Sequence, residues 1–353
     1  MKLLILTQKV DATDDVLGFM HGWIAEFAKN FEAVTVVCLE KGEYNLAQNV
    51  NVLSLGKENG RSRLKYFLNF YKYIWQERKN YDVVFVHMNP EYVVFGGLLW
   101  RLWGKKVGLW YAHGAVTWPL QVARIFVHTI FTSTVSGCRI KSKKIKVVGQ
   151  GIDTEKFRIK KAELKNKDEP FEITTVGRIS PSKDYETLIK ATDLLHKKGL
   201  PIKVSIVGGV GLNSQDLYLS KLTDLVSKSG LTSVITFVGP VSNEKILPYL
   251  HGADLFVNMG QTGSLDKAIL EAMAVGLPIL TCNEALIEVL GDYRDALMYP
   301  KRDYGMFADR IERIVISTIL IREKIGGDLR DIVIRDHSLP RFVKIIANEL
   351  NGQ

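Results

Sequence analysis

Residues 172–191 read EITTVGRISPSKDYETLIKA, and the pattern changes from strand to helix within this run. Its first part is rich in β-branched residues, as in a buried strand, whereas Leu188 and Ile189 belong to a helical pattern. The loop between them carries Arg178 where the strand ends and Lys183 where the helix starts. These two cations can converge on one diphosphate, although a solvated loop with two ordinary charges explains the same spacing.

A second informative run, GQTGSLDKAILEAMAVG at residues 260–276, follows an apolar strand. Its helix is predicted to start near Ser264 or Asp266, where exposed backbone N–H groups can cradle a phosphate. Glu271 lies one to two turns further and suits two neighbouring ribose hydroxyls. Taken alone, Glu271 also fits a solvent-facing helix residue, and Asp266 fits an N-cap or first-turn acid.

The rest of the chain alternates short β-branched runs with amphipathic segments, which predicts parallel sheets covered on both faces. The predicted strands fall into two series, four and then five: 3–6, 34–39, 83–88 and 106–113, followed by 172–178, 203–209, 234–239, 255–259 and 278–282. We therefore expect an α/β protein with two doubly wound domains in tandem. In such sheets ligands bind at the carboxyl ends of the strands.

The two series are separated near residue 150 by a basic stretch at 141–146, the run GQGIDTEKF at 149–157 and the charged run 160–170. This break in the alternation of strands and helices predicts an N-terminal domain over residues 1–150 and a C-terminal domain over 151–336. Residues 1–150 hold 20 lysines and arginines against 11 acids, so they carry the whole net charge of +9. That asymmetry indicates an anionic partner for the first domain.

Composition argues against several other classes of protein. Three widely spaced cysteines without a CxxC pair argue against a disulfide framework or a zinc site and favour a reducing compartment. The start, MKLLILTQKV, has too short an apolar stretch for a signal peptide and is predicted to be a strand. The nearest candidate for a membrane span, 92–103, is short and contains Arg101. A cytoplasmic location is therefore expected.

The motifs VGRISPSKDYETLIKA, IVGG (206–209), FVG (237–239) and LEAMAVGLPIL (270–280) occur in this order. The set resembles the family-four glycosyltransferases, most clearly over residues 145–290. In the first half the match rests on YAHG at 111–114 and the loop around Gly18. The resemblance implies the GT-B fold, in which two Rossmann-like domains face each other across a cleft. It also implies a C-terminal helix, about 337–353, that packs back on the N-terminal, acceptor-side domain.

The same resemblance implies a retaining sugar transfer from a nucleotide diphospho-sugar, a UDP- or GDP-sugar, with no metal or other cofactor. Arg178 and Lys183 match the pair that grips the donor diphosphate, and Glu271 matches the acid that binds the nucleotide ribose. The family has a further glutamate where this sequence has Gly263. We expect Asp266 to supply that carboxylate as a catalytic residue, with a pseudoenzyme as the alternative.

Other donor contacts are implied in both domains. His113 matches a histidine that touches the donor sugar near the reacting carbon, and we assign it a catalytic role, although a lone histidine is usually structural. The glycine cluster at 208–211 is explained equally by close packing and by ligand contact. Four further residues are expected at the donor diphosphate: Gly18, Ser264, Leu265 and Lys267. Two residues are expected near the nucleotide base: Gly239 and Val241.

Retention requires either a covalent intermediate or attack on the same face of the sugar. Since no candidate carboxylate stands out beneath the sugar, same-face attack that relies on positioning and charge stabilisation is the predicted route. Two other functions fit the motifs. One is a nucleotide-sugar epimerase, and the other is a non-catalytic nucleotide-sugar-binding subunit.

The acceptor is expected to be a lipid-linked or cell-surface glycan. Segment 61–79, RSRLKYFLNFYKYIWQERK, is predicted to be an amphipathic helix with Leu64, Phe67, Leu68 and Tyr71 in the core. A nucleic-acid partner is not expected, because no motif supports it. Other aromatic side chains are expected to rest on an anionic membrane surface, the inner face of the cytoplasmic membrane: Tyr66, Phe70, Tyr73, Trp100, Trp103, Trp110 and Trp118.

Overall fold

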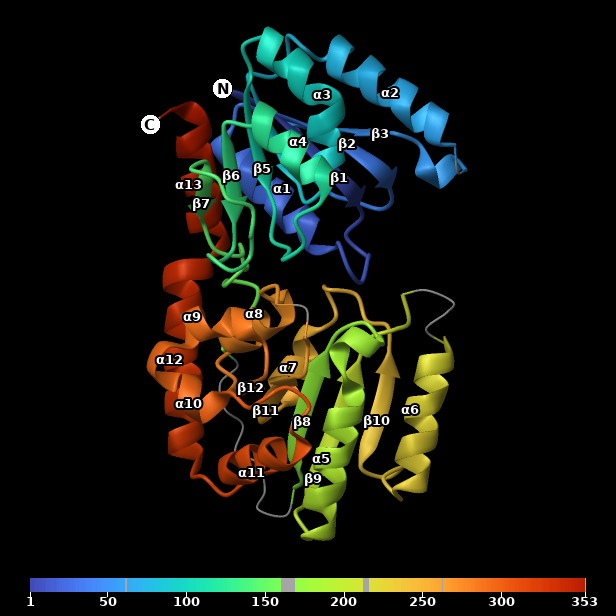
Figure 1. Cartoon of the computed structure of the whole chain (residues 1–353), viewed down its shortest axis with the longest axis vertical. Helices are drawn as coiled ribbons and strands as arrows, with labels where there is room; N and C mark the ends of the chain where they lie inside the picture. The colour runs from blue at the N-terminus through green and yellow to red at the C-terminus, as the bar shows by residue number, and fades with distance from the viewer. Residues whose placement is uncertain (61, 160–168, 212–215, 262, 353) are drawn as a thin grey trace. The chain divides into compact units, whose positions relative to one another are not determined.

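The computed structural model describes residues 1–60, 62–159, 169–211, 216–261 and 263–352 (Figure 1). The chain forms two compact units. The N-terminal unit comprises Met1–Asp153, Ser242–Glu244 and Asp336–Gln353, and the C-terminal unit comprises Thr154–Val241 and Lys245–Arg335. The division therefore falls three residues after the predicted boundary. Most of the charged run predicted as the linker, 160–168, lies outside the described residues.

The N-terminal unit is built on a seven-stranded sheet in the order β3-β2-β1-β4-β5-β6-β7, and all of its pairings are parallel. Three of these strands, β3, β6 and β7, are absent from the predicted set. They lie at or next to the edges of the sheet. The strands are β1 (Lys2–Val10), β2 (Ala33–Lys41), β3 (Val50–Ser54), β4 (Val83–His87), β5 (Lys106–Trp110), β6 (Thr129–Thr132) and β7 (Ile145–Val147).

Helices cover both faces of this sheet. Alternate side chains of β1 enter opposite cores: Leu3 and Ile5 pack with α1 and α13, whereas Leu4 and Leu6 pack with α2, α3 and α4. This alternation follows from the two-residue period of a strand and confirms the doubly wound arrangement. The helices are α1 (Phe19–Asn30), η1 (Lys57–Asn59), α2 (Arg63–Gln76), α3 (Pro90–Leu102), α4 (Trp118–Phe126) and α13 (Leu339–Asn351).

The C-terminal helix α13 belongs to the N-terminal unit. The ring centroids of Phe342 and Trp23 lie 4.2 Å apart, and the Trp23 indole N–H donates to the carbonyl of Gly151 at 2.8 Å. Both aromatic side chains are almost fully buried. The last helix of the chain therefore completes the core of its first domain.

The buried face of α2 differs from the predicted one. The side chains of Leu64 and Leu68 are 68% and 59% exposed, whereas Phe70 and Ile74 are buried. The predicted core stripe was wrong because α2 carries apolar residues all round, so helical spacing alone admits more than one buried face. Three aromatic side chains predicted to contact a membrane are buried in the core instead, so that prediction was wrong for them: Phe70, Trp100 and Trp110.

The C-terminal unit holds a five-stranded parallel sheet in the order β10-β9-β8-β11-β12, and its strands match the second predicted series. They are β8 (Phe171–Val176), β9 (Ile202–Val207), β10 (Ile235–Gly239), β11 (Leu255–Asn258) and β12 (Ile279–Thr281). Its helices are η2 (Pro181–Lys183), α5 (Tyr185–Lys197), α6 (Asp216–Lys228), α7 (Leu247–Gly252), α8 (Lys267–Ala274), η4 (Glu284–Leu286), α9 (Ile287–Leu290), η5 (Gly291–Tyr293), α10 (Arg294–Leu297), α11 (Tyr304–Val315) and α12 (Ile319–His337).

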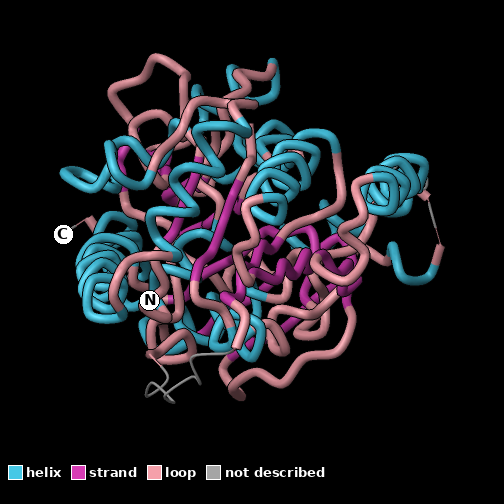
Figure 2. The backbone as a smooth tube through the Cα atoms, turned by 90° about the horizontal axis from the view of Figure 1, so that it is seen from below, coloured by secondary structure: helices cyan, strands magenta, loops and turns pink. Residues whose placement is uncertain are grey.

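The strands lie inside and the helices outside, as expected for parallel sheets (Figure 2). Among the residues that the structure describes, no helix combines the length and the apolar composition that a bilayer crossing requires.

Candidate functional site

Three glycines lie side by side at the carboxyl ends of β8, β9 and β10. The Gly208 N–H donates to the Gly239 carbonyl at 2.9 Å, and a Cβ added to Gly208 would lie 2.0 Å from the carbonyl oxygen of Gly177. Gly208 also has φ +145°, which disfavours any side chain. Close packing therefore explains Gly208, and the three residues present only backbone at this edge. Gly239, which was expected near the base, forms part of it.

The loop between β8 and α5 is anchored beside this edge. The Tyr185 hydroxyl donates to the Gly177 carbonyl at 2.9 Å, and the Tyr185 ring is buried. The Lys183 side chain lies against Gly177, where an added Cβ would come within 3.1 Å of its Cε. Arg178 follows Gly177 and is exposed. The loop thus holds one cation against the sheet edge and presents a second one to solvent.

The ammonium of Lys183 forms an ion pair with the carboxylate of Asp266. The same carboxylate oxygen accepts a hydrogen bond from the side-chain amide of Asn258 at 3.2 Å. Asp266 occupies the N-cap position of α8, but its side chain makes no capping bond. The alternative of an ordinary N-cap is therefore wrong, since this carboxylate faces the β8–α5 loop.

Asn258 also organises the loop that precedes α8. Its side-chain oxygen accepts from the Gly260 N–H at 3.0 Å, and the residue is 2% exposed. Asn258 is not among the predicted site residues, although it is a polar residue at the end of an otherwise apolar strand. Further along the loop, the Ser264 carbonyl accepts from the Asn283 side chain at 2.8 Å, and Leu265 is buried.

Gly263 stands where the resemblance predicts a glutamate, and it has φ +68°. A glutamate would rarely adopt this left-handed conformation, because its Cβ crowds the backbone. The backbone of this loop therefore favours glycine. The nearest carboxylate in the chain stands three residues later, at Asp266.

The first turns of α8 carry a lysine and an acid of opposite charge. Glu271 is 6% exposed, so the alternative of a solvent-facing helix residue is wrong. Burial lowers the pKa of Lys267 to about 7, and the negative charge of Glu271 opposes this shift. A carboxylate buried to this extent needs a charged or hydrogen-bonded partner. Val241, expected near the base, is partly buried after β10.

Gly18 and His113 lie in the N-terminal unit. Gly18 precedes α1, and a Cβ there would lie 2.5 Å from the Asp14 carbonyl oxygen, so the turn requires glycine. His113 follows β5 and is exposed. Its Nδ1 accepts the Ala115 N–H at 3.0 Å, so the neutral ring carries its proton on Nε2. Both residues stand at the carboxyl edge of their own sheet. The residues that the structure brings together are those of the C-terminal unit.

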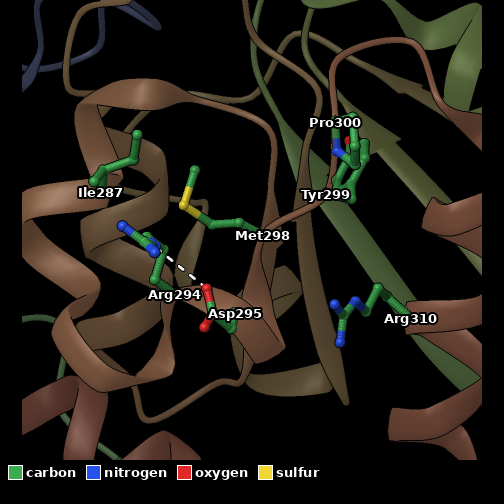
Figure 3. A pocket seen from close by; sticks show the side chains of 7 residues that line it. All are labelled: Ile287, Arg294, Asp295, Met298, Tyr299, Pro300 and Arg310. Carbon is green, nitrogen blue, oxygen red and sulfur yellow. Dashed lines mark hydrogen bonds and ion pairs between the residues drawn. The ribbon is translucent and has the colours of Figure 1, made fainter.

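A separate cavity of about 370 Å³ opens in the C-terminal unit (Figure 3). It shares no residue with the predicted site and is lined by Ile287, Arg294, Asp295, Met298, Tyr299, Pro300 and Arg310. Its connection to the site is Tyr299, whose hydroxyl donates to the Asn258 carbonyl at 3.4 Å. Within the described ranges, no group of three or more His, Cys, Asp or Glu side chains is arranged to hold a metal ion.

Two Rossmann-like parallel sheets in tandem define the chain as an α/β protein with the GT-B fold. Alr3699/HepE from Anabaena, solved in complex with UDP, is 16% identical with a TM-score of 0.79, and 100% of both chains is covered. Sucrose-phosphate synthase from Thermosynechococcus elongatus is 14% identical with a TM-score of 0.77, covering 100% of this chain and 99% of that one. A glycosyltransferase from Rickettsia africae is 15% identical with a TM-score of 0.74, covering 99% of each. Identities this low establish the fold alone.

The sequence itself matches two family models. Residues 156–326 match the model for glycosyl transferases group 1, and residues 12–117 match the model for glycosyl transferase 4-like. The chain is therefore a glycosyltransferase of the GT-B superfamily. A comparison with curated protein sequences finds no significant match.

Proposed function

We propose that this protein is a retaining, metal-independent enzyme that transfers a sugar from a nucleotide diphospho-sugar to a lipid-linked or cell-surface glycan. The grouping of Lys183, Asp266 and the start of α8 at one sheet edge, next to the exposed Arg178, carries the proposal. Such an edge is where doubly wound sheets bind nucleotides. The UDP bound to the HepE relative supports a uridine donor, with a GDP-sugar as the alternative.

The proposed roles follow from charge and position. Arg178 and Lys183 neutralise the leaving diphosphate, where each preorganised donor typically contributes about 10²–10³ in rate. The backbone N–H groups of residues 264–267 add positive potential at the start of α8, and Lys267 adds to it in its protonated form. Glu271 accepts hydrogen bonds from the ribose hydroxyls. The base lies along the glycine edge, near Gly239.

The Asp266 carboxylate competes with the donor diphosphate for the ammonium of Lys183. When a diphosphate binds Lys183, it replaces the Asp266 carboxylate as the counter-charge. We propose that the released carboxylate then accepts hydrogen bonds from the sugar hydroxyls. A separate proposal is that His113 contacts the donor sugar through its Nε2–H. The bond between the sugar carbon and phosphate oxygen breaks as the acceptor oxygen bonds to that carbon on the same face. The departing phosphate takes the acceptor's proton.

Binding experiments test the donor site. UDP, GDP and ADP are titrated against the protein by calorimetry, and the tightest ligand is then titrated against Arg178→Gln and Lys183→Met. Each variant should bind at least tenfold more weakly, about 1.4 kcal/mol, because a charge-assisted contact to phosphate is lost. Lys190→Met is the matched control, since Lys190 is an exposed cation on α5. Equal affinity in all three variants would mean that the nucleotide binds elsewhere.

A product analysis separates the enzyme classes. Donor incubated alone should remain unchanged, and donor with a glycolipid fraction should yield a glycosylated lipid. An epimer formed without acceptor would show the epimerase instead. Binding without turnover on any acceptor fraction would show the non-catalytic subunit. A cytoplasmic location at the inner face of the cytoplasmic membrane is part of the proposal, because such acceptors and nucleotide sugars meet there.

A further inference from the structure

We propose that the N-terminal unit docks on an anionic lipid bilayer through one surface formed by α2 and α3. This α2–α3 face consists of seven exposed large hydrophobic side chains: Leu64, Phe67, Leu68, Trp75, Phe95, Leu98 and Leu102. The inference extends the lipid-linked acceptor of the proposed function. It rests on no residue of the donor site and is tested without a sugar donor.

Both helices point an apolar stripe away from the sheet. On α2 the exposed positions are spaced three, four and seven residues apart, so they share one side of the helix. Of the α2 side chains, only Phe70 and Ile74 are fully packed in the core. On α3, Leu98 and Leu102 are 57% and 73% exposed, while Trp100 between them is buried. The exposed stripe is therefore separate from the face that holds each helix in the fold.

The two stripes form one continuous surface, and the two helices run side by side (Figure 1). The Phe67 and Phe95 rings lie 5.6 Å apart, and the Tyr71 hydroxyl donates to the Phe95 carbonyl at 3.0 Å. The Trp75 and Trp103 rings also lie 5.6 Å apart. A contiguous apolar surface of this kind marks an interaction site, whereas singly scattered exposed residues do not.

Positive charge surrounds this surface. Residues 62–106 contain eight lysines and arginines but only three acids. Among them, Lys65, Lys72 and Arg101 are exposed on the same two helices, and the Arg78 guanidinium lies 4.8 Å from the centre of the Trp75 ring. Long basic side chains around apolar and aromatic ones are typical of helices that lie in the headgroup region of an anionic membrane. Each cation near such a surface strengthens the attraction to anionic lipid.

Other occupants fit this combination less well. A second copy of the chain would bring two positively charged surfaces together, which disfavours self-association. Nucleic acid complements the charge, but four of the seven exposed hydrophobic side chains of the α2–α3 face are leucines, which neither stack on bases nor donate hydrogen bonds. Lipid acyl chains and anionic headgroups complement both features at once.

The test is co-sedimentation of the full-length protein with sucrose-loaded vesicles at low salt, without nucleotide. We expect binding to phosphatidylglycerol vesicles and at least tenfold weaker binding to phosphatidylcholine vesicles. Leu68→Glu combined with Leu98→Glu should weaken binding to phosphatidylglycerol at least tenfold. Both side chains are exposed, so the variant should fold, as a thermal unfolding curve identical to the wild type would verify.

The matched control is Leu217→Glu combined with Leu320→Glu, two leucines in the C-terminal unit that are each 73% exposed. It adds the same negative charge and should retain wild-type binding. The proposal is overturned if the wild type stays in the supernatant with phosphatidylglycerol, or if the control loses as much binding as the test variant. It is also overturned if the wild type forms a dimer or binds an oligonucleotide and the test variant loses that association instead of vesicle binding. Since no donor is present, these outcomes are independent of the nucleotide titrations.

Discussion

At the residue scale, the carboxylate of Asp266 is the counter-charge of Lys183. Asp266 lies three residues after the left-handed Gly263, and its side chain pairs with Lys183 without making a capping bond to α8. An acid in this position has two opposite effects on a donor. Its charge repels the incoming diphosphate, whereas its oxygen atoms suit the hydroxyls of the transferred sugar.

Asp266→Asn separates these two effects. Removing a partly exposed negative charge next to the diphosphate should tighten UDP binding about fivefold, or about 1 kcal/mol. Turnover should nevertheless fall at least about a hundredfold, because an interaction that positions the sugar is lost. Titration calorimetry and initial rates measure the two quantities.

Asp193→Asn provides the control for this change. Its side chain is 21% exposed, against 22% for Asp266, and it also pairs with a lysine, Lys197. It should leave affinity and rate unchanged. Unaltered turnover in Asp266→Asn would remove the catalytic role from this residue, and weaker UDP binding would show that the carboxylate supports the donor.

At the scale of elements, the carboxyl edge of β8, β9 and β10 depends on backbone contact. Gly208→Ala would force its Cβ toward the Gly177 carbonyl in a left-handed conformation. Overpacking and backbone strain together should cost about 3 kcal/mol of unfolding free energy. Nucleotide binding should weaken too, since the β8–α5 loop that carries Lys183 starts at Gly177. Denaturant unfolding and UDP titration measure both effects.

Gly252→Ala is the corresponding control in the same unit, because an added Cβ there meets nothing within 4 Å and φ is not positive. It should be nearly neutral. If Gly208→Ala were equally neutral, the edge would have room to move and the glycine would not be required by packing.

The strands of the C-terminal sheet and the helix α2 could be located from the sequence, but a buried face could not always be predicted. The five strands of the C-terminal unit were predicted, because each is a short run rich in β-branched and other apolar residues between turn signals. The helix over 63–76 was predicted as well, but its buried face was wrong. Periodicity identifies a helix with two apolar stripes, whereas the neighbouring sheet determines which stripe is covered.

At the scale of the whole molecule, the first and last parts of the chain form one core. Phe342 lies far from α1 in the sequence, yet its ring packs on Trp23. Phe342→Ala should destabilise the N-terminal unit by about 3–5 kcal/mol, as other buried aromatic truncations do. Hydrogen exchange should accelerate in α1 and leave α5 of the C-terminal unit protected.

Phe307→Ala reverses this pattern as a control, since Phe307 is fully buried in α11 of the C-terminal unit. Its exchange should accelerate in α5 and not in α1. Faster exchange in α5 after Phe342→Ala would show that α13 supports the C-terminal unit instead.

The sequence by itself determined the α/β class, the tandem domains, the loop that carries Arg178 and Lys183 and the helix that carries Glu271, because these features depend on local periodicity and on residues close together in the chain. Only the tertiary structure decided that Asp266 pairs with Lys183, that Asn258 supports this pair and that Glu271 is buried. It also decided that the leucines of α2 face outward. These outcomes depend on which distant segments pack together, and the spacing of residues along the chain carries no record of that choice.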